Sequence, residues 1–224
     1  MRTNLPLFPA APCAVFFVLA IATWVPPACA GENSPLSPLL EVQIVGREVL
    51  AIDSENGGQR SERLERGEAV LYTRSQGRVG LVVTDRRMLA ISSGSGSFQV
   101  ARYRKGEGPP SDVQIGDRVA LAMMQSRAVG FDGSSHNLVE STIGPREIVL
   151  DTAVGPNVAM VVTDRRALGL SADRGGFFDV RLRVGEQFQS LSAYANHATL
   201  QTSQRLLIFR GPDATWEERR LPIN

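Results

Sequence analysis

Two copies of one charged phrase contain the residues best suited to do chemistry. Thr84-Asp85-Arg86-Arg87 recurs as Thr163-Asp164-Arg165-Arg166. Its last arginine recurs alone at Arg127 and Arg205, and glutamates recur with the arginines at Glu68, Glu107, Glu147 and Glu186. A guanidinium group binds carboxylate or phosphate through two parallel hydrogen bonds. These residues could therefore capture an anionic ligand, or they could pair with one another.

The repetition of the phrase favours pairing within the fold, because a scaffold feature recurs with a repeat whereas a ligand site usually breaks its symmetry. We therefore predict that most of these residues form turns and join neighbouring repeats. This structural set comprises Thr84, Asp85, Arg87, Arg127, Thr163, Asp164, Arg166, Arg205, Glu68, Glu107, Glu147 and Glu186. The competing hypothesis is a ring of arginines that binds an anion, with Arg86 and Arg165 as ligand-binding residues.

One stretch of the chain departs from the pattern and is a second candidate for binding. Gly108-Pro109-Pro110-Ser111 lengthens a loop there, and Met123-Met124-Gln125-Ser126 stands where the charged phrase is expected. If the protein has a ligand site, we expect it beside this stretch, with Met124 and Gln125 among its residues. Loops carry function more often than the elements that they connect.

Other patterns do not predict catalysis, a metal or a cofactor. His136 and His197 are the two histidines, and their spacing matches no metal-ligand motif. Segments such as Asp132-Gly133-Ser134-Ser135 do not complete a calcium loop and are typical of turns. The chain has no G-x-S-x-G elbow for a serine nucleophile. A pair of carboxylates roughly 5–10 Å apart, as glycosidases use, remains an alternative.

The elements that must position these residues belong to one repeat of about 39 residues. Val79–Ser92 and Val158–Ser171 are near-copies that lie 79 residues apart. Further copies fit at the same register at Leu39–Asp53, Val119–Phe131 and His197–Phe209. The predicted repeats are 39–68, 69–107, 108–147, 148–186 and 187–224. Such self-similarity indicates one supersecondary unit per repeat, stacked on its neighbours.

Each repeat divides into four short strands. In the second copy these are Ala69–Thr73, Val79–Val83, Met88–Ile91 and Phe98–Arg104. Gly, Ser, Asp and Asn separate the third strand from the fourth, and these residues favour tight turns. The second and third strands are apolar on both faces, which is typical of sheets covered on each side. The fourth strand alternates with charge, as an exposed edge does.

Four antiparallel strands per repeat, apolar inside and charged outside, resemble the blade of a β-propeller. The resemblance implies an all-β fold, a small propeller of about five four-stranded blades, and covers residues 39–224. Residues 31–38 read GENSPLSP, so the first repeat lacks a clear first strand. Closure of the ring is therefore left open, and an irregular β-barrel or sandwich is the alternative fold.

The first thirty residues have the features of a signal peptide. Arg2 precedes the apolar segment Ala14–Val25, and Ala28-Cys29-Ala30 forms a small-residue cleavage site. The segment is too short to span a bilayer of roughly 30 Å, so we expect no transmembrane span. Residues 31–224 then form a single repeat domain that is periplasmic or secreted. The alternative is a lipoprotein anchored through Cys29.

Charge indicates no nucleic-acid partner. Without Arg2 the chain retains 23 of its 24 basic residues, which balance 23 acidic ones. A balanced chain lacks the basic footprint of a nucleic-acid-binding protein. The sequence therefore predicts a non-enzymatic binding or scaffold module of the cell envelope, with an envelope protein as its expected partner. The alternative function is an envelope hydrolase or lyase that acts on carbohydrate.

Overall fold

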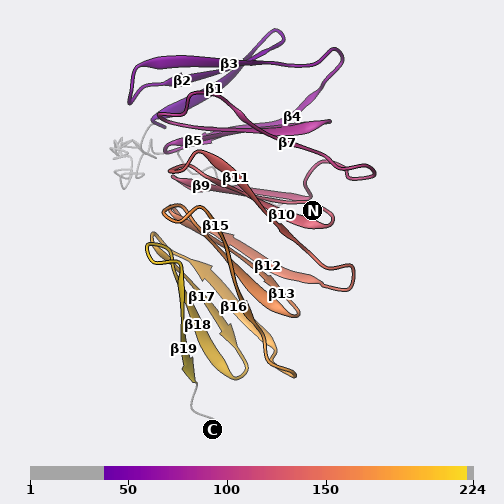
Figure 1. The fold of residues 1–224 in the computed structure, drawn as a ribbon, viewed down its shortest axis with the longest axis vertical. Helices are drawn as coiled ribbons and strands as arrows, with labels where there is room; N and C mark the ends of the chain where they lie inside the picture. Colours follow the sequence, from indigo (N-terminus) through magenta and orange to yellow (C-terminus); the bar gives the residue numbers. More distant parts are fainter. Residues whose placement is uncertain (1–37, 221–224) are drawn as a thin grey trace, which may run out of the picture. The chain divides into compact units, whose positions relative to one another are not determined.

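The computed structural model describes residues 38–220, all within one compact unit, Leu36–Asn224. The described chain forms nineteen strands, and every strand pairs antiparallel with the next one along the chain within its sheet (Figure 1). The resulting five sheets are the five repeats predicted from the sequence. The described part of the first repeat contributes three strands, and each of the others contributes four.

The strands of the first two sheets lie close to their predicted positions. The first sheet contains β1 (Leu40–Val45), β2 (Glu48–Asp53) and β3 (Gly58–Arg63). The second contains β4 (Val70–Gln76), β5 (Val79–Thr84), β6 (Arg87–Ser92) and β7 (Gln99–Arg102). In each sheet the last strand is at an edge, as its alternating charge indicates.

The other three sheets repeat the same order. The third contains β8 (Asp112–Ile115), β9 (Val119–Met123), β10 (Arg127–Asp132) and β11 (Asn137–Thr142). The fourth contains β12 (Val149–Val154), β13 (Val158–Thr163), β14 (Arg166–Ser171) and β15 (Gly176–Arg181). The fifth contains β16 (Phe188–Ala193), β17 (His197–Thr202), β18 (Arg205–Arg210) and β19 (Thr215–Arg220).

The hydrophobic core lies between sheets, in four clusters of buried residues. Each cluster takes its residues from two consecutive sheets, as Leu81 of β5 and Ala120 of β9 illustrate. Burial of such apolar side chains contributes about 25 cal/mol per Å² and is the main stabilising contribution in a chain that packs sheet on sheet. Within residues 38–220, no cluster joins the fifth sheet to the first.

The two end sheets differ from the three between them. Strands β5 and β13 are buried at every position, as the sequence predicts for strands covered on both faces. In β1 the sequence prediction of two covered faces is wrong, because Glu41 and Gln43 are exposed between buried Leu40 and Val42. Strand β17 alternates in the same way. Among the described residues, each end sheet therefore has a neighbouring sheet on one face only.

The predicted signal peptide, its cleavage site and Cys29 lie outside the described residues. Export and lipidation therefore stay predictions. Within residues 38–220, the structure has no helix that is long and apolar enough to cross a membrane.

Candidate functional site

The recurring arginine lies in a polar cluster at the seam between two sheets. Arg87 begins β6, and its guanidinium donates to Glu68 from Nε at 2.9 Å and from Nη2 at 3.2 Å. The same Nη2 donates to the Arg63 carbonyl at 2.7 Å, which belongs to the preceding sheet. Thr84 places its hydroxyl 2.8 Å from Glu68 and accepts the Arg87 backbone N–H. The cluster therefore ties the second sheet to the first.

The same cluster recurs at the next three seams. Arg127, Arg166 and Arg205 each bind the matching glutamate, at Nε–Oε or Nη–Oε distances of 2.7, 2.8 and 2.8 Å. Each also donates to a carbonyl of the preceding sheet, on Arg102, Thr142 and Arg181. This geometry is the one that the structural hypothesis requires, because each guanidinium is engaged on two sides by the protein itself.

The glutamates of these clusters remain ionised because of their hydrogen bonds. Burial alone raises the pKa of the Glu186 carboxyl, but the hydrogen bonds from Arg205, the Arg183 amide and Thr202 outweigh burial and lower it to about 2. The pKa of Glu147 falls to about 2 in the same way, through Arg166, the Gly144 amide and Thr163. These carboxylates are poor general acids at neutral pH.

We expect acid to destabilise the fold through these carboxylates. A carboxyl with a depressed folded pKa stabilises the fold above its unfolded pKa, near 4.5, and that stabilisation is lost as pH falls through the folded value. The free energy of unfolding should thus fall between about pH 4.5 and 2, by on the order of 2–3 kcal/mol for each of Glu147 and Glu186. Urea unfolding at a series of pH values measures this loss, and a free energy of unfolding independent of pH over this window would contradict it.

The other residues of the charged phrase form the turns. The carboxylates of Asp85 and Asp164 each accept a backbone N–H, from Ala69 and Ile148, at 2.9 Å. Arg86 is exposed and pairs with Glu65 at 3.3 Å. Arg165 is also exposed and donates to the Arg146 carbonyl at 3.1 Å. Arg86 and Arg165 lie in separate turns, and neither lines a hollow with Met124 and Gln125.

The break in symmetry at the third repeat changes its first strand. In the second, fourth and fifth sheets the first strand pairs up to a threonine, with a bulge at Leu71, Leu150 and Gln189. Met124 replaces that threonine in the third sheet, and the pairing of β8 reaches only Met123. Pro109 and Pro110 precede β8, and because proline has no N–H to donate, the strand begins late.

A hollow of about 490 Å³ lies beside this shortened strand, between the third and fourth sheets. Its apolar side chains come from both sheets, and Leu150 is 43% exposed. The lining residues are Ser111, Asp112, Met123, Met124, Gln125, Ile143, Glu147, Val149, Leu150, Asp151 and Thr152. Met124 and Gln125, which the sequence predicts as binding residues, therefore both line this hollow. Leu150 and Asp112 were not among the predicted site residues, because the bulge and the exposure that mark Leu150 appear only in the structure.

Polar groups bridge the two sheets at the hollow. The Asp112 carboxylate accepts hydrogen bonds from the Thr152 hydroxyl and from the Gln114 amide, both at 2.9 Å. Gln114 also donates to Thr152 at 2.8 Å. Asp112 is thus held in place by its neighbours. Asp151 is exposed, and its carboxylate accepts a hydrogen bond from the backbone N–H of the adjacent Thr152. The hollow combines an apolar wall with a carboxylate at its rim.

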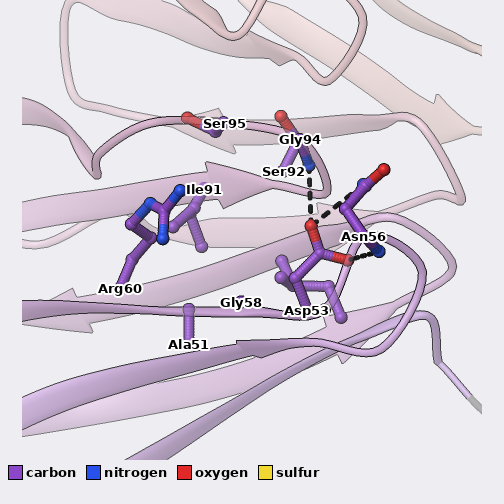
Figure 2. Close-up of a pocket in the computed structure, with 11 residues that line it drawn as sticks. Ala51, Asp53, Asn56, Gly58, Arg60, Ile91, Ser92, Gly94 and Ser95 are labelled. Carbon is purple, nitrogen blue, oxygen red and sulfur yellow. Dashed lines mark hydrogen bonds between the residues drawn. The ribbon is translucent and has the colours of Figure 1, made fainter.

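A second hollow, of about 280 Å³, lies between the first and second sheets. Figure 2 shows Asp53 there, directed at Asn56 and at the Gly94 amide. Burial raises the pKa of Asp53, but these hydrogen bonds outweigh burial and hold it far below its usual value. The Asp53 carboxylate thus joins two turns through hydrogen bonds.

No protein-family model matches the chain, and no curated protein matches it. Some solved structures are similar to the chain at low identity. Human WBSCR16 is 14% identical over 64% of this chain and 47% of its own, with a TM-score of 0.38. Apo AztD from Citrobacter koseri is 13% identical over 82% and 60%, with a TM-score of 0.39. Hsv2 of Kluyveromyces lactis is 10% identical over 84% and 83%, with a TM-score of 0.33.

The chain spans less than two thirds of the length of WBSCR16 and of AztD. At such identities the likeness concerns the fold alone. The repeat, the sheet order and the inter-sheet cores make this chain an all-β protein of the β-propeller type, with five blades. The prediction of a small propeller is confirmed at the level of the blade and its repetition, and no particular family is identified.

Proposed function

We propose that this protein is an exported, non-enzymatic binding module of the cell envelope, and that the hollow beside β8 takes a segment of a partner protein. The observation that carries the proposal is the coincidence of the hollow with the break in symmetry. The polar clusters at all four seams are satisfied by the protein itself, whereas Val149 and Leu150 of β12 are open to solvent at the hollow beside Met124. Exposed apolar surface rimmed by polar groups is typical of a protein-binding site.

The lining indicates the chemistry of the segment. Met124 and Leu150 suit an apolar side chain, and methionine adapts to irregular partners because its chain is flexible. Asp151 at the rim suits a basic neighbour of that side chain, because an opposite charge steers and orients association. The segment is therefore expected to carry a leucine-like residue next to arginine or lysine.

The same geometry supports binding over hydrolysis. A glycosidase needs two carboxylates free to act on the substrate. Glu147 at this hollow is bound to Arg166 at 2.8 Å, and Asp112 is engaged by Thr152 and Gln114. Of the three carboxylates that line the hollow, only that of Asp151 is exposed at the rim. This arrangement of carboxylates favours binding of a partner without chemical change to it.

We expect a photo-crosslinking amino acid in place of Gln125 to capture a partner in cells that export the protein. The matched position is Ser203, which occupies the same register in the fifth repeat and is also exposed. Adducts should form at position 125 and not at 203, because only the former borders the hollow. Mass spectrometry of the adduct would identify the captured segment.

Leu150→Asp should reduce this capture by about tenfold, because it places a charge in the apolar wall and because a buried leucine contributes about 1.5–3 kcal/mol. Leu71→Asp is the matched control, since Leu71 is the bulge residue of the second repeat and is 55% exposed. Equal crosslinking from positions 125 and 203, or capture at position 125 that survives Leu150→Asp, would contradict the proposal.

A further inference from the structure

Consecutive blades approach each other closely at two positions of the repeat. The first position is in the second strand of the repeat, where every blade after the first has a small residue. A Cβ on Gly80 would lie 2.3 Å from Cγ2 of Val42 in the preceding blade. The same register holds Ala120, Ala159 and Ala198 in the following blades. A side chain larger than alanine has no room there when a blade precedes.

The second position is in the turn that follows the first strand. A Cβ on Gly116 would lie 2.1 Å from the Gly155 carbonyl oxygen of the next blade. A Cβ on Gly155 would lie 2.1 Å from the Tyr194 carbonyl oxygen of the blade after that. Real Cβ atoms do not approach backbone oxygens so closely, so glycine is required at Gly116 and Gly155. In the second blade Gln76 has this register, and the next residue makes the close approach instead: a Cβ on Gly77 would lie 2.6 Å from Cα of Asp117 in the third blade.

Both positions change at the two ends of the array. Glu41 of the first blade has the register of Gly80, and it is exposed. Tyr194 of the fifth blade has the register of Gly116 and Gly155; it is 52% exposed and stacks on His197 at a ring-centroid distance of 4.8 Å. Glu41 thus stands where an adjoining blade would need glycine or alanine. The turn Tyr194-Ala195-Asn196 of the fifth blade has no glycine, whereas the same turn of each blade that has a following neighbour contains one.

The faces around these two side chains also carry polar residues, beside apolar ones such as Val45 and Ile208. On the outer face of β1, Gln43 stands in the register of buried Val82. On the outer face of β17, Thr199 and Gln201 stand in the registers of buried Leu81 and Val83. Terminal repeats of stacked arrays need such polar outer faces for solubility.

Backbone hydrogen bonds also join this turn of one blade to the same turn of the next, and they stop at the fifth blade. Arg78 N–H donates to the Asp117 carbonyl, Arg118 N–H to Pro156, and Asn157 N–H to Ala195, at 2.8, 2.8 and 3.0 Å. Asn196 has the same register in the fifth blade, and no carbonyl of residues 38–220 accepts its N–H. The link that each blade makes to the next therefore stops at the fifth.

We infer that Glu41 and Tyr194 are caps that hold the five blades as an open array. Neither the other end of the chain nor a second copy can then dock as an adjoining blade in the geometry of the repeat. This inference concerns the ends of the array and is independent of the function proposed for the hollow. Within residues 38–220 the ring is then incomplete, and both of its ends are shielded.

A pair of introduced cysteines tests whether the ends meet. Thr199 and Glu41 have the registers of Leu121 and Ala159, which lie in one core cluster between adjacent blades. We expect oxidation of Glu41→Cys/Thr199→Cys to yield at least about tenfold less disulfide than Leu121→Cys/Ala159→Cys, because cysteines with Cα atoms more than about 7 Å apart cannot be bridged. Peptide mapping distinguishes the introduced pair from Cys13 and Cys29. A disulfide between positions 41 and 199, within one chain or between two, would overturn the inference.

Removing the caps tests whether these side chains are the cause. Tyr194→Gly and Glu41→Ala, combined with Gln43→Val, Thr199→Val and Gln201→Val, should allow the ends to pack. Light scattering coupled to size exclusion should then show a larger molar mass, or a smaller hydrodynamic radius at unchanged mass. An unchanged mass and radius would show that Glu41 and Tyr194 do not keep the array open.

Discussion

Replacing Arg205 with alanine is expected to lower the free energy of unfolding by about 3–5 kcal/mol, because removing one partner of a buried ion pair leaves an uncompensated charge. The side chain of Arg205 is 4% exposed and that of Glu186 is fully buried. Besides Glu186, the guanidinium donates to Glu218 at 2.6 Å and to the Arg181 carbonyl at 2.8 Å. All three acceptors would lose the Arg205 donor at once, and among the described residues buried Glu186 would keep only the Thr202 hydroxyl and the Arg183 amide as donors.

Two other arginines provide a graded comparison for Arg205→Ala. Arg166 makes the equivalent contact with Glu147, but its side chain is 25% exposed, so water can replace part of what is lost. Arg166→Ala should therefore cost about 1–3 kcal/mol. Arg219 pairs with Glu217 while 66% exposed, and Arg219→Ala should cost about 0–1 kcal/mol.

Urea unfolding followed by circular dichroism measures the three free energies. The order Arg205, Arg166, Arg219 is the decisive result, because it tests burial as the cause. If the clusters instead hold an anionic ligand and contribute little to the fold, Arg205→Ala would leave the midpoint of unfolding unchanged. That outcome would favour the competing hypothesis, in which a ring of arginines binds an anion.

Phe209→Ala is expected to cost about 3–5 kcal/mol as well, through the loss of a large buried ring. Phe209 is fully buried in β18 and packs against Trp216 at a centroid distance of 5.1 Å. The ring also crosses the seam to the fourth blade, where a Cβ on Gly169 would lie 2.5 Å from its Cγ. The ring therefore fills the space that a glycine leaves in the neighbouring blade.

This close approach predicts a coupling between the two positions. Gly169→Ala alone should cost on the order of 1–3 kcal/mol, because the added methyl group displaces the Phe209 ring. In the Phe209→Ala background the same methyl group enters the cavity, so its cost should vanish or become a gain. A double-mutant cycle from urea unfolding measures this coupling. Additive effects would show that the two residues do not meet in solution.

The sequence by itself determined the repeat, its strands and its turns. The charged phrase and the glutamates recur in register, and the structure brings Arg87 to Glu68 as pairing requires. These features are local or repeated, so that side-chain alternation and turn chemistry are enough to predict them. The expectation that a site would lie near Met124 and Gln125 also came from sequence alone, through the loss of the repeated phrase.

The tertiary structure decided which faces are covered and which residues meet. Leu150 and Met124 belong to different repeats, and their meeting at the hollow depends on how two sheets pack. Within residues 38–220, the first and fifth sheets are each covered on one face only. Such contacts join residues far apart in the chain, and local propensity does not encode them. Glu41 and Tyr194 were readable in the sequence, but only the distance between blades showed that the register of Glu41 requires a small residue and that the turn of Tyr194 would need a glycine if a blade followed.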